Sequence, residues 1–152
     1  MTVDLKAIGT NLAGRYAPGQ VATPSGGDAI ASSTAQPPKV IGQTPAILVI
    51  VDQGSFGEGG ANGTRLGTID WRVCLYYHQA DASAWELDAG VIQDYLATMF
   101  DQHLIDLDLG GKVVTTRTLG FRMGLLTYAG KTFSGGELRV RTITTEAWAP
   151  AA

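Results

Sequence analysis

The sequence has few of the residues that build redox, metal and nucleic-acid sites. It contains one cysteine, Cys74, and two histidines in 152 residues, so no disulfide can form within the chain and no CxxC pair is present to bind a metal. Charged residues make up only 16%, and 14 acidic against 11 basic residues give a net charge of −3. With this balance we do not expect a protein whose main task is to hold a nucleic-acid backbone.

Long apolar runs are also missing. The longest, Pro45–Val51, is far shorter than the roughly 20 residues that cross a bilayer, so no membrane partner is expected. The first 16 residues include Asp4, Lys6 and Arg15 and have no apolar signal-peptide core. We therefore expect synthesis in a reducing cytoplasm.

The chain does have enough apolar residues, 45%, for one core, and we predict a single domain over residues 1–152. Its low charge content is typical of subunits whose surface is covered by neighbours in an assembly. Segment 18–39 is rich in Gly, Ser, Thr, Ala and Pro. We expect it to add nothing to the core, and to be either flexible or an extended arm that orders against a neighbouring subunit.

Hydrophobic spacing predicts the elements of the first half. Residues 2–16 form a helix capped by Thr2, and residues 45–52 form a strand buried on both faces. A glycine-rich turn over 53–64 leads into a strand over 68–78. Alternation in that strand places one apolar set on the core face: Ile69, Trp71, Val73, Leu75 and Tyr77.

The clearest predicted element is a helix over residues 84–103. Ser83 and Glu86 have the spacing of a capping box at its start. Two i,i+4 rows are expected to pack on a sheet: Leu87, Val91, Tyr95 and Met99, and beside them Ile92, Leu96, Phe100 and Leu104. The opposite side is predicted to be polar and carries Asp88, Gln93, Asp94, Thr98 and Asp101.

Two further strands, 113–128 and 137–148, are predicted around a loop over 129–136, and Gly120 and Gly124 indicate a bulge or bend in the first of them. The element order predicts an α+β fold. We expect an antiparallel sheet of about four strands, with the N-terminal helix and the long amphipathic helix packed on one face.

No sequence motif carries recognisable chemistry. Gly57–Gly63 resembles a dinucleotide fingerprint, but a strand follows where a helix is needed. Gly124–Thr132 has one residue too many for a phosphate loop and no helix after it. Cys74, in the middle of a strand, is expected to be buried and inert. We therefore predict no catalytic residue, no cofactor and no metal site.

An enzyme remains the weakest alternative. The two histidines, His78 and His103, lie at a strand end and a helix end and have no HExxH-type spacing. A hydrolytic site would have to combine His78 with Asp70 and a distant acid.

Charged residues divide between two elements, and this division suggests contact surfaces. The helix carries Asp88, Asp94 and Asp101, which could form a paired-carboxylate site but are more simply a solvated helix face or an exposed negative surface. The C-terminal hairpin carries Arg117, Arg122, Arg139 and Arg141, which complement an acidic neighbour. We hypothesise that the acidic helix of one subunit meets the basic hairpin of the next around a ring. The loops containing Gly57, Glu58, Gly59 and Gly60, and Lys131, are expected to contact axial neighbours.

The order of elements resembles the tail terminator proteins of long-tailed bacteriophages. The resemblance rests on the N-terminal helix, the Gln36-Pro37-Pro38 approach to Thr44–Val49, and the returning strand Asp70–Tyr77. It continues through the Ala-rich entry Gln79–Ala84 into the amphipathic helix and the closing hairpin, so it covers nearly the whole chain. The long segment 18–39 departs from the shorter versions expected in this family.

The resemblance implies a structural virion protein. Six copies would form a ring at the head-proximal end of the tail tube, stop tube polymerisation and join the tail to the head connector. The implied partners are further copies of the chain, the major tail tube protein and a connector or stopper protein. DNA would pass through an acidic lumen without sequence-specific binding, and the resemblance makes Asp88, Asp94 and Asp101 the candidate acidic lining of that lumen. The protein would be made in the bacterial cytoplasm and end in the virion. Another neck or connector protein, or a tail tube subunit, is the alternative.

Overall fold

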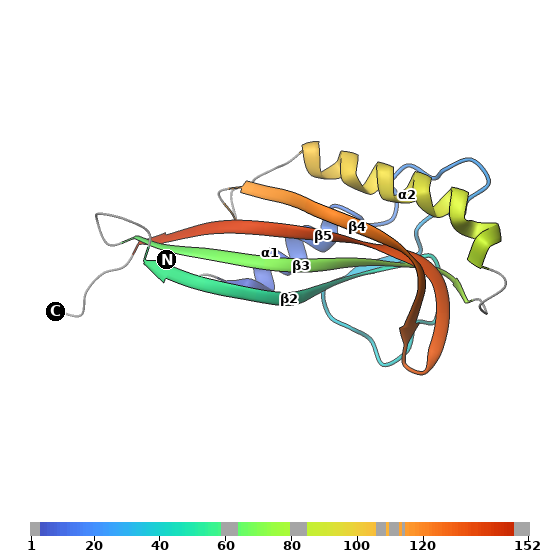
Figure 1. Ribbon diagram of the computed structural model, residues 1–152, viewed down its shortest axis with the longest axis horizontal. Coiled ribbons are helices and arrows are strands. Elements are labelled where there is room, and N and C mark those ends of the chain that lie inside the picture. Colours follow the sequence, from blue (N-terminus) through green and yellow to red (C-terminus); the bar gives the residue numbers. More distant parts are fainter. Residues whose placement is uncertain are drawn as a thin grey trace.

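The computed structural model describes residues 4–58, 64–79, 85–105, 109, 113 and 115–147, with the backbone alone at 58, 64–66, 85, 103–105 and 145–147. These residues form an α+β fold of two helices and a five-stranded mixed sheet (Figure 1). The elements are, in chain order, α1 (Leu5–Gly14), β1 (Ser32–Thr34), β2 (Ala46–Glu58), β3 (Thr64–Gln79), α2 (Trp85–Ile105), β4 (Thr115–Tyr128) and β5 (Lys131–Ala147).

The sheet has the strand order β1-β2-β3-β5-β4. Neighbouring strands are antiparallel except for β1, which runs parallel to β2 through Ala46–Leu48. The predicted α+β class is confirmed, but the prediction of about four strands, all antiparallel, is wrong. The added strand β1 has only three polar residues, too few for a visible alternation.

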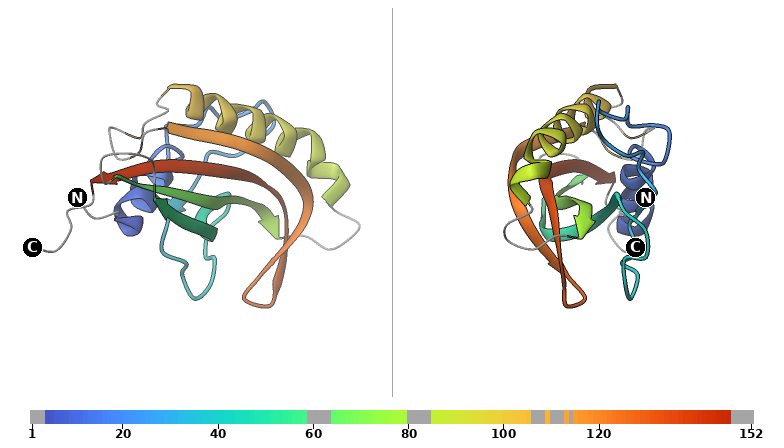
Figure 2. Two further views of the ribbon diagram at one scale, coloured as in Figure 1. Left: turned by 60° about the vertical axis from the view of Figure 1, so that its left-hand side comes forward. Right: turned by 90° about the vertical axis from the view of Figure 1, so that its right-hand side faces the viewer.

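Both helices pack on the same side of the sheet, as predicted, because residues of both belong to one buried cluster, and Figure 2 shows α2 lying over β4. The main core lies between them and includes Leu12 of α1, Tyr95 of α2 and Trp71 of β3, each at most 2% exposed. All five residues predicted for the core face of the 68–78 strand are buried there. We call this side of the sheet the helix face and the other side the open face.

Segment 18–39 does contribute to the core. Val21 and Ile30 are each 4% exposed and belong to the main cluster, and Ser33 Oγ donates to the carbonyl oxygen of Ala13 at 2.6 Å. The expectation that this segment supplies nothing to the core is wrong, because two isolated aliphatic residues and β1 are enough to attach it to α1 and β2.

The first helix begins later than predicted. Asp4 is the N-cap, and its side chain accepts a hydrogen bond from the amide of Ala7 at 3.0 Å. Thr2, the predicted cap, lies outside the described residues. The predicted cap of the second helix, Ser83, lies outside them as well.

Two predicted glycine-rich loops are largely strand. Residues 53–58 continue β2, and residues 131–136 begin β5, which leaves only Ala129 and Gly130 in the turn after β4. Both turn residues have positive φ, 51° and 80°, as a two-residue type I′ hairpin turn requires. Several of the glycines lie inside strands because a side chain would not fit. A Cβ on Gly135 would lie 2.0 Å from the Leu75 carbonyl oxygen.

A second, smaller cluster lies on the open face near the β4–β5 turn. It contains Cys74, Tyr76, Leu126 and Phe133 together with Ile41, Ala46 and Leu48. Tyr76 packs edge-on against Phe133, with ring centroids 5.5 Å apart. The hydroxyl of Tyr128 donates to the Pro38 carbonyl oxygen, which joins the segment before β2 to the hairpin.

The burial of Cys74 in this cluster was predicted and has a measurable consequence. Desolvation raises the pKa of its thiol from 9.0 to about 11, which lowers the thiolate fraction at pH 8 about 100-fold. We expect no reaction of the native protein with a disulfide reagent in one hour, and one reactive thiol per chain in denaturant. Rapid labelling of the native protein would contradict this placement.

Candidate assembly surfaces

The open face of the sheet carries a ladder of charged residues. The pairing register places Arg72 opposite Arg139, Asp70 opposite Arg141, and Glu137 opposite Arg122. Side chains directly opposite one another across a strand pair share a face. With Arg117, which lies opposite Arg141, this ladder contains five arginines and two carboxylates, an excess of three positive charges.

Two of the predicted contact arginines already have partners in the same subunit. Arg141 binds Asp70 through two hydrogen bonds of 2.8 and 3.2 Å, and Arg122 Nε lies 3.1 Å from Glu137 Oε1. Arg72 binds the other oxygen of Glu137 at 2.9 Å. A contact between the acidic helix and the basic hairpin of neighbouring subunits would therefore depend mainly on Arg117 and Arg139, which are exposed.

The Asp70 pair makes stability depend on pH. The hydrogen bonds from Arg141 are the largest of the effects that hold the pKa of Asp70 below its ordinary value. The ionised carboxylate is favoured in the folded state, so the pair stabilises the protein above the unfolded pKa of about 3.9. This contribution is lost as the pH falls through the lower, folded pKa.

We therefore expect the Arg141→Met variant to be less stable than the parent at pH 7 and to approach it as the pH falls below about 4. Urea unfolding at pH 7, 5, 4 and 3 measures the difference. Lys131→Met, which removes an exposed cation of the same hairpin that has no carboxylate partner among the described contacts, is the control. A difference that stayed constant with pH would contradict the linkage.

The three predicted acidic residues of the long helix do not share a face. Asp94 and Asp101 are exposed, whereas the side chain of Asp88 is 22% exposed and accepts a hydrogen bond from Ser134 Oγ at 2.7 Å. Residues along a helix are about 100° apart, which puts Asp88 within the arc that Tyr95 and Met99 use to reach the sheet. The predicted acidic lining is thus reduced to Asp94 and Asp101.

The same geometry explains two exposed apolar residues of α2. Leu87 is 86% exposed and Phe100 is 41% exposed, although both belong to rows predicted to pack on the sheet. An i,i+4 row turns by about 40° at each step. A row of four residues therefore covers about 120°, so Leu87, which begins one row, and Phe100, which lies late in the other, leave the buried arc.

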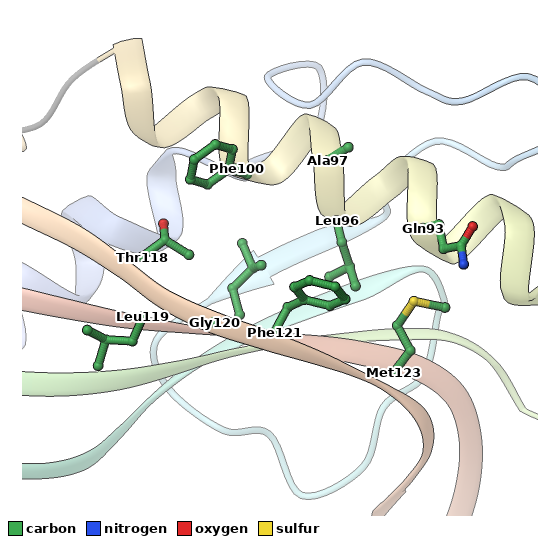
Figure 3. A pocket seen from close by; sticks show the side chains of 10 residues that line it. Gln93, Leu96, Ala97, Phe100, Thr118, Leu119, Gly120, Phe121 and Met123 are labelled. Atoms are coloured by element: carbon green, nitrogen blue, oxygen red, sulfur yellow. The ribbon is translucent and has the colours of Figure 1, made fainter.

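An apolar groove follows the side of α2 that faces β4 (Figure 3). Its volume is about 480 Å³, and its walls are Leu96, Ala97 and Phe100 of α2 and Leu119, Phe121 and Met123 of β4. A bulge between Thr118 and Gly120 displaces Leu119 from the strand register; the predicted irregularity at Gly120 is thus confirmed. The sequence does not indicate this groove, because the groove depends on which strand neighbours the helix.

His78 lies in a polar cluster where segment 18–39, α2 and β3 meet. Its Nε2 lies 2.8 Å from Asp28 Oδ2 and its Nδ1 lies 3.8 Å from Asp88 Oδ2. Asp70 is eight residues away along the same strand, about 26 Å in an extended chain, and pairs with Arg141. The structure therefore does not bring His78 and Asp70 together. His103 has no described side chain.

The predicted axial contacts are only partly described. Gly57 is exposed at the end of β2, and Lys131 is the exposed first residue of β5 rather than a loop residue. Glu58 is described as backbone alone, and Gly59 and Gly60 lie outside the described residues. Within the part of the chain that the structure covers, no group of three or more His, Cys, Asp or Glu residues is arranged to bind a metal ion.

The described helices include none that is long and apolar enough to cross a membrane. No protein-family model matches the sequence, and no curated protein matches it.

Proposed function

We propose that the protein is a structural subunit of a bacteriophage tail terminator, which assembles as a hexameric ring at the head-proximal end of the tail tube. The proposal extends the resemblance noted in the sequence. In this role the ring stops tube polymerisation and provides the surface that joins the tail to the head connector. Its contacts are with further copies, with the tube protein below and with the connector protein above.

One observation carries the proposal: apolar side chains are exposed along two opposite edges of the sheet. In the part of the chain that the structure describes, nine large hydrophobic residues are exposed. Five of them lie along β4, the last strand on one side, and along the part of β2 that extends beyond its pairing with β1: Val51, Phe56, Leu119, Phe121 and Leu125. Large exposed apolar patches mark interaction surfaces. Surfaces on opposite edges of one sheet suit a heterologous contact that closes into a ring.

The charge distribution favours one orientation toward DNA. The open face has an excess of arginine and would hold a phosphate backbone, whereas the outer side of α2 carries Asp94 and Asp101 and would repel it. A channel that must release DNA is better lined by the acidic side. We therefore propose that α2 faces the lumen and that the arginines of the open face lie away from it.

Electron microscopy of purified tails tests this proposal. Tails from particles that contain the chain should carry one ring of this subunit at the head-proximal end, with α2 on the channel side. Rings stacked along the whole tube would instead make the chain a tube subunit. A density on the connector that is absent from the tail end would make it a neck protein.

A further inference from the structure

The sheet ends on both sides in a strand whose outer edge has no strand partner among the described residues. β4 is the last strand on one side over all its 14 residues. On the other side β1 pairs only with Ala46–Leu48, so β2 has a free outer edge from Val51 to Glu58. Unpaired edges of this length expose hydrogen-bonding groups that readily pair with another chain.

Apolar side chains on the helix face accompany both edges. Phe121 of β4 is 68% exposed and lies in the groove beside α2. Phe56 of β2 is 59% exposed and lies opposite Gly67 of β3. The register places Phe121 opposite Leu138 and Val51 opposite Trp71, and both partners belong to the main core under the helices.

We infer that the outer edge of β2 in one copy adds to the outer edge of β4 in the next, and that Phe56 of the added strand occupies the groove between α2 and β4. This inference rests on the proposed ring and names the contact that closes it. We infer that this strand pairing, and not the charged contact between helix and hairpin, is the main connection between subunits. Arg122 and Arg141 of the hairpin already bind carboxylates within their own subunit.

Strand direction and face both agree with this joint. Within a subunit β4 runs antiparallel to β2, because each of the three intervening pairings is antiparallel. Rotation about an axis parallel to the strands keeps these directions, so β2 of one copy meets β4 of the next in antiparallel order. The helix faces of the two sheets then lie on the same side, and Phe56 enters on the side where the groove lies.

The groove also contains a polar group that an added strand can reach. In the groove, the buried hydroxyl oxygen of Thr118 has no hydrogen-bond partner among the residues that the structure describes. A strand added at this edge supplies backbone groups that can pair with it.

The test uses two variants of the full chain, and each variant disrupts one of the two contact surfaces: the groove between α2 and β4, or the outer edge of β2. Phe121→Asp places a charge in the groove and leaves the β2 edge intact, whereas Phe56→Asp spoils the β2 edge and leaves the groove intact. We expect each variant alone to weaken self-association at least 100-fold. Mixed together they should form a dimer and nothing larger, because one intact groove meets one intact β2 edge. Leu87→Asp, at a residue 86% exposed outside the groove, is the control and should associate as the parent does.

Analytical ultracentrifugation of each protein at concentrations up to 1 mM, and of the mixture, gives the result. Rings that persist in both aspartate variants would overturn the joint and leave the proposed ring standing. A parent chain that stays monomeric at 1 mM would also overturn the joint, and the rings on isolated tails would then decide the proposed function separately. Circular dichroism of the variants establishes that they fold.

Discussion

Replacing Trp71 with alanine is expected to lower the free energy of unfolding by about 4 kcal/mol, as is usual when a buried tryptophan is truncated in a core. Trp71 is 2% exposed in the middle of β3. A Cβ on Gly9 of α1 would lie only 3.1 Å from its ring, so the indole is the surface on which α1 rests. Its loss leaves a cavity and removes the support of that helix.

The indole also satisfies a buried hydrogen bond. Its Nε1–H donates to Thr142 Oγ1 at 2.9 Å, and that oxygen is itself buried. Trp71→Phe keeps most of the volume and loses the hydrogen bond, so we expect it to cost about 2 kcal/mol. Urea unfolding of the parent and both variants measures these differences. A loss below about 1 kcal/mol for Trp71→Ala would contradict the packing of α1 on β3.

Adding one methyl group at Gly135 is expected to destabilise the protein by about 3 kcal/mol, the upper part of the range for overpacking. Its Cβ would meet the Leu75 carbonyl oxygen at 2.0 Å and the Leu126 side chain at 3.2 Å. The first of these neighbours is backbone and cannot move without shifting β3. The β3–β5 pairing should therefore separate locally around this position.

Gly120→Ala is the matched control for Gly135→Ala. Gly120 lies in the neighbouring strand of the same hairpin, and nothing lies within 4 Å of the Cβ it would gain. We expect a gain of about 0.5 kcal/mol, because alanine has less backbone freedom than glycine in the unfolded chain. Equal effects of the two substitutions, measured by urea unfolding, would contradict the close approach of β5 to β3.

The core face of residues 68–78 could be predicted from the sequence, whereas the role of Gly135 could not. Alternation in residues 68–78 predicted the core face correctly, because a strand buried on one face leaves a period-two pattern. Glycine-rich stretches were predicted as loops, because glycine favours turns in general. Here Gly135 lies inside a strand, where lack of space against Leu75 excludes a side chain. That requirement exists only once β3 and β5 are paired.

The candidate surfaces were predictable only in part. The basic character of the C-terminal hairpin followed from its arginines, but the partners of Arg141 and Arg122 come from β3 and β5 by long-range pairing. The free edges depend on the strand order, in which β5 inserts between β3 and β4. Nothing in the local pattern of either strand indicates which edge it leaves open. The prediction for Asp88 is also wrong. Its polarity suggested the exposed side of α2, whereas the 100° step between helical residues places it on the sheet side, beside Tyr95 and Met99.

The length distribution of tails in particles made without this chain tests the proposed function most directly. Without a terminator ring, tube growth has no stop, so electron microscopy should show headless tails much longer than normal and variable in length. Restoring the chain should restore a single length. Tails of normal length that fail to join heads would contradict the terminator role and move the protein to the connector side of the neck. A complete absence of tails would point instead to a tube subunit, and unchanged particles would exclude a structural role in the tail.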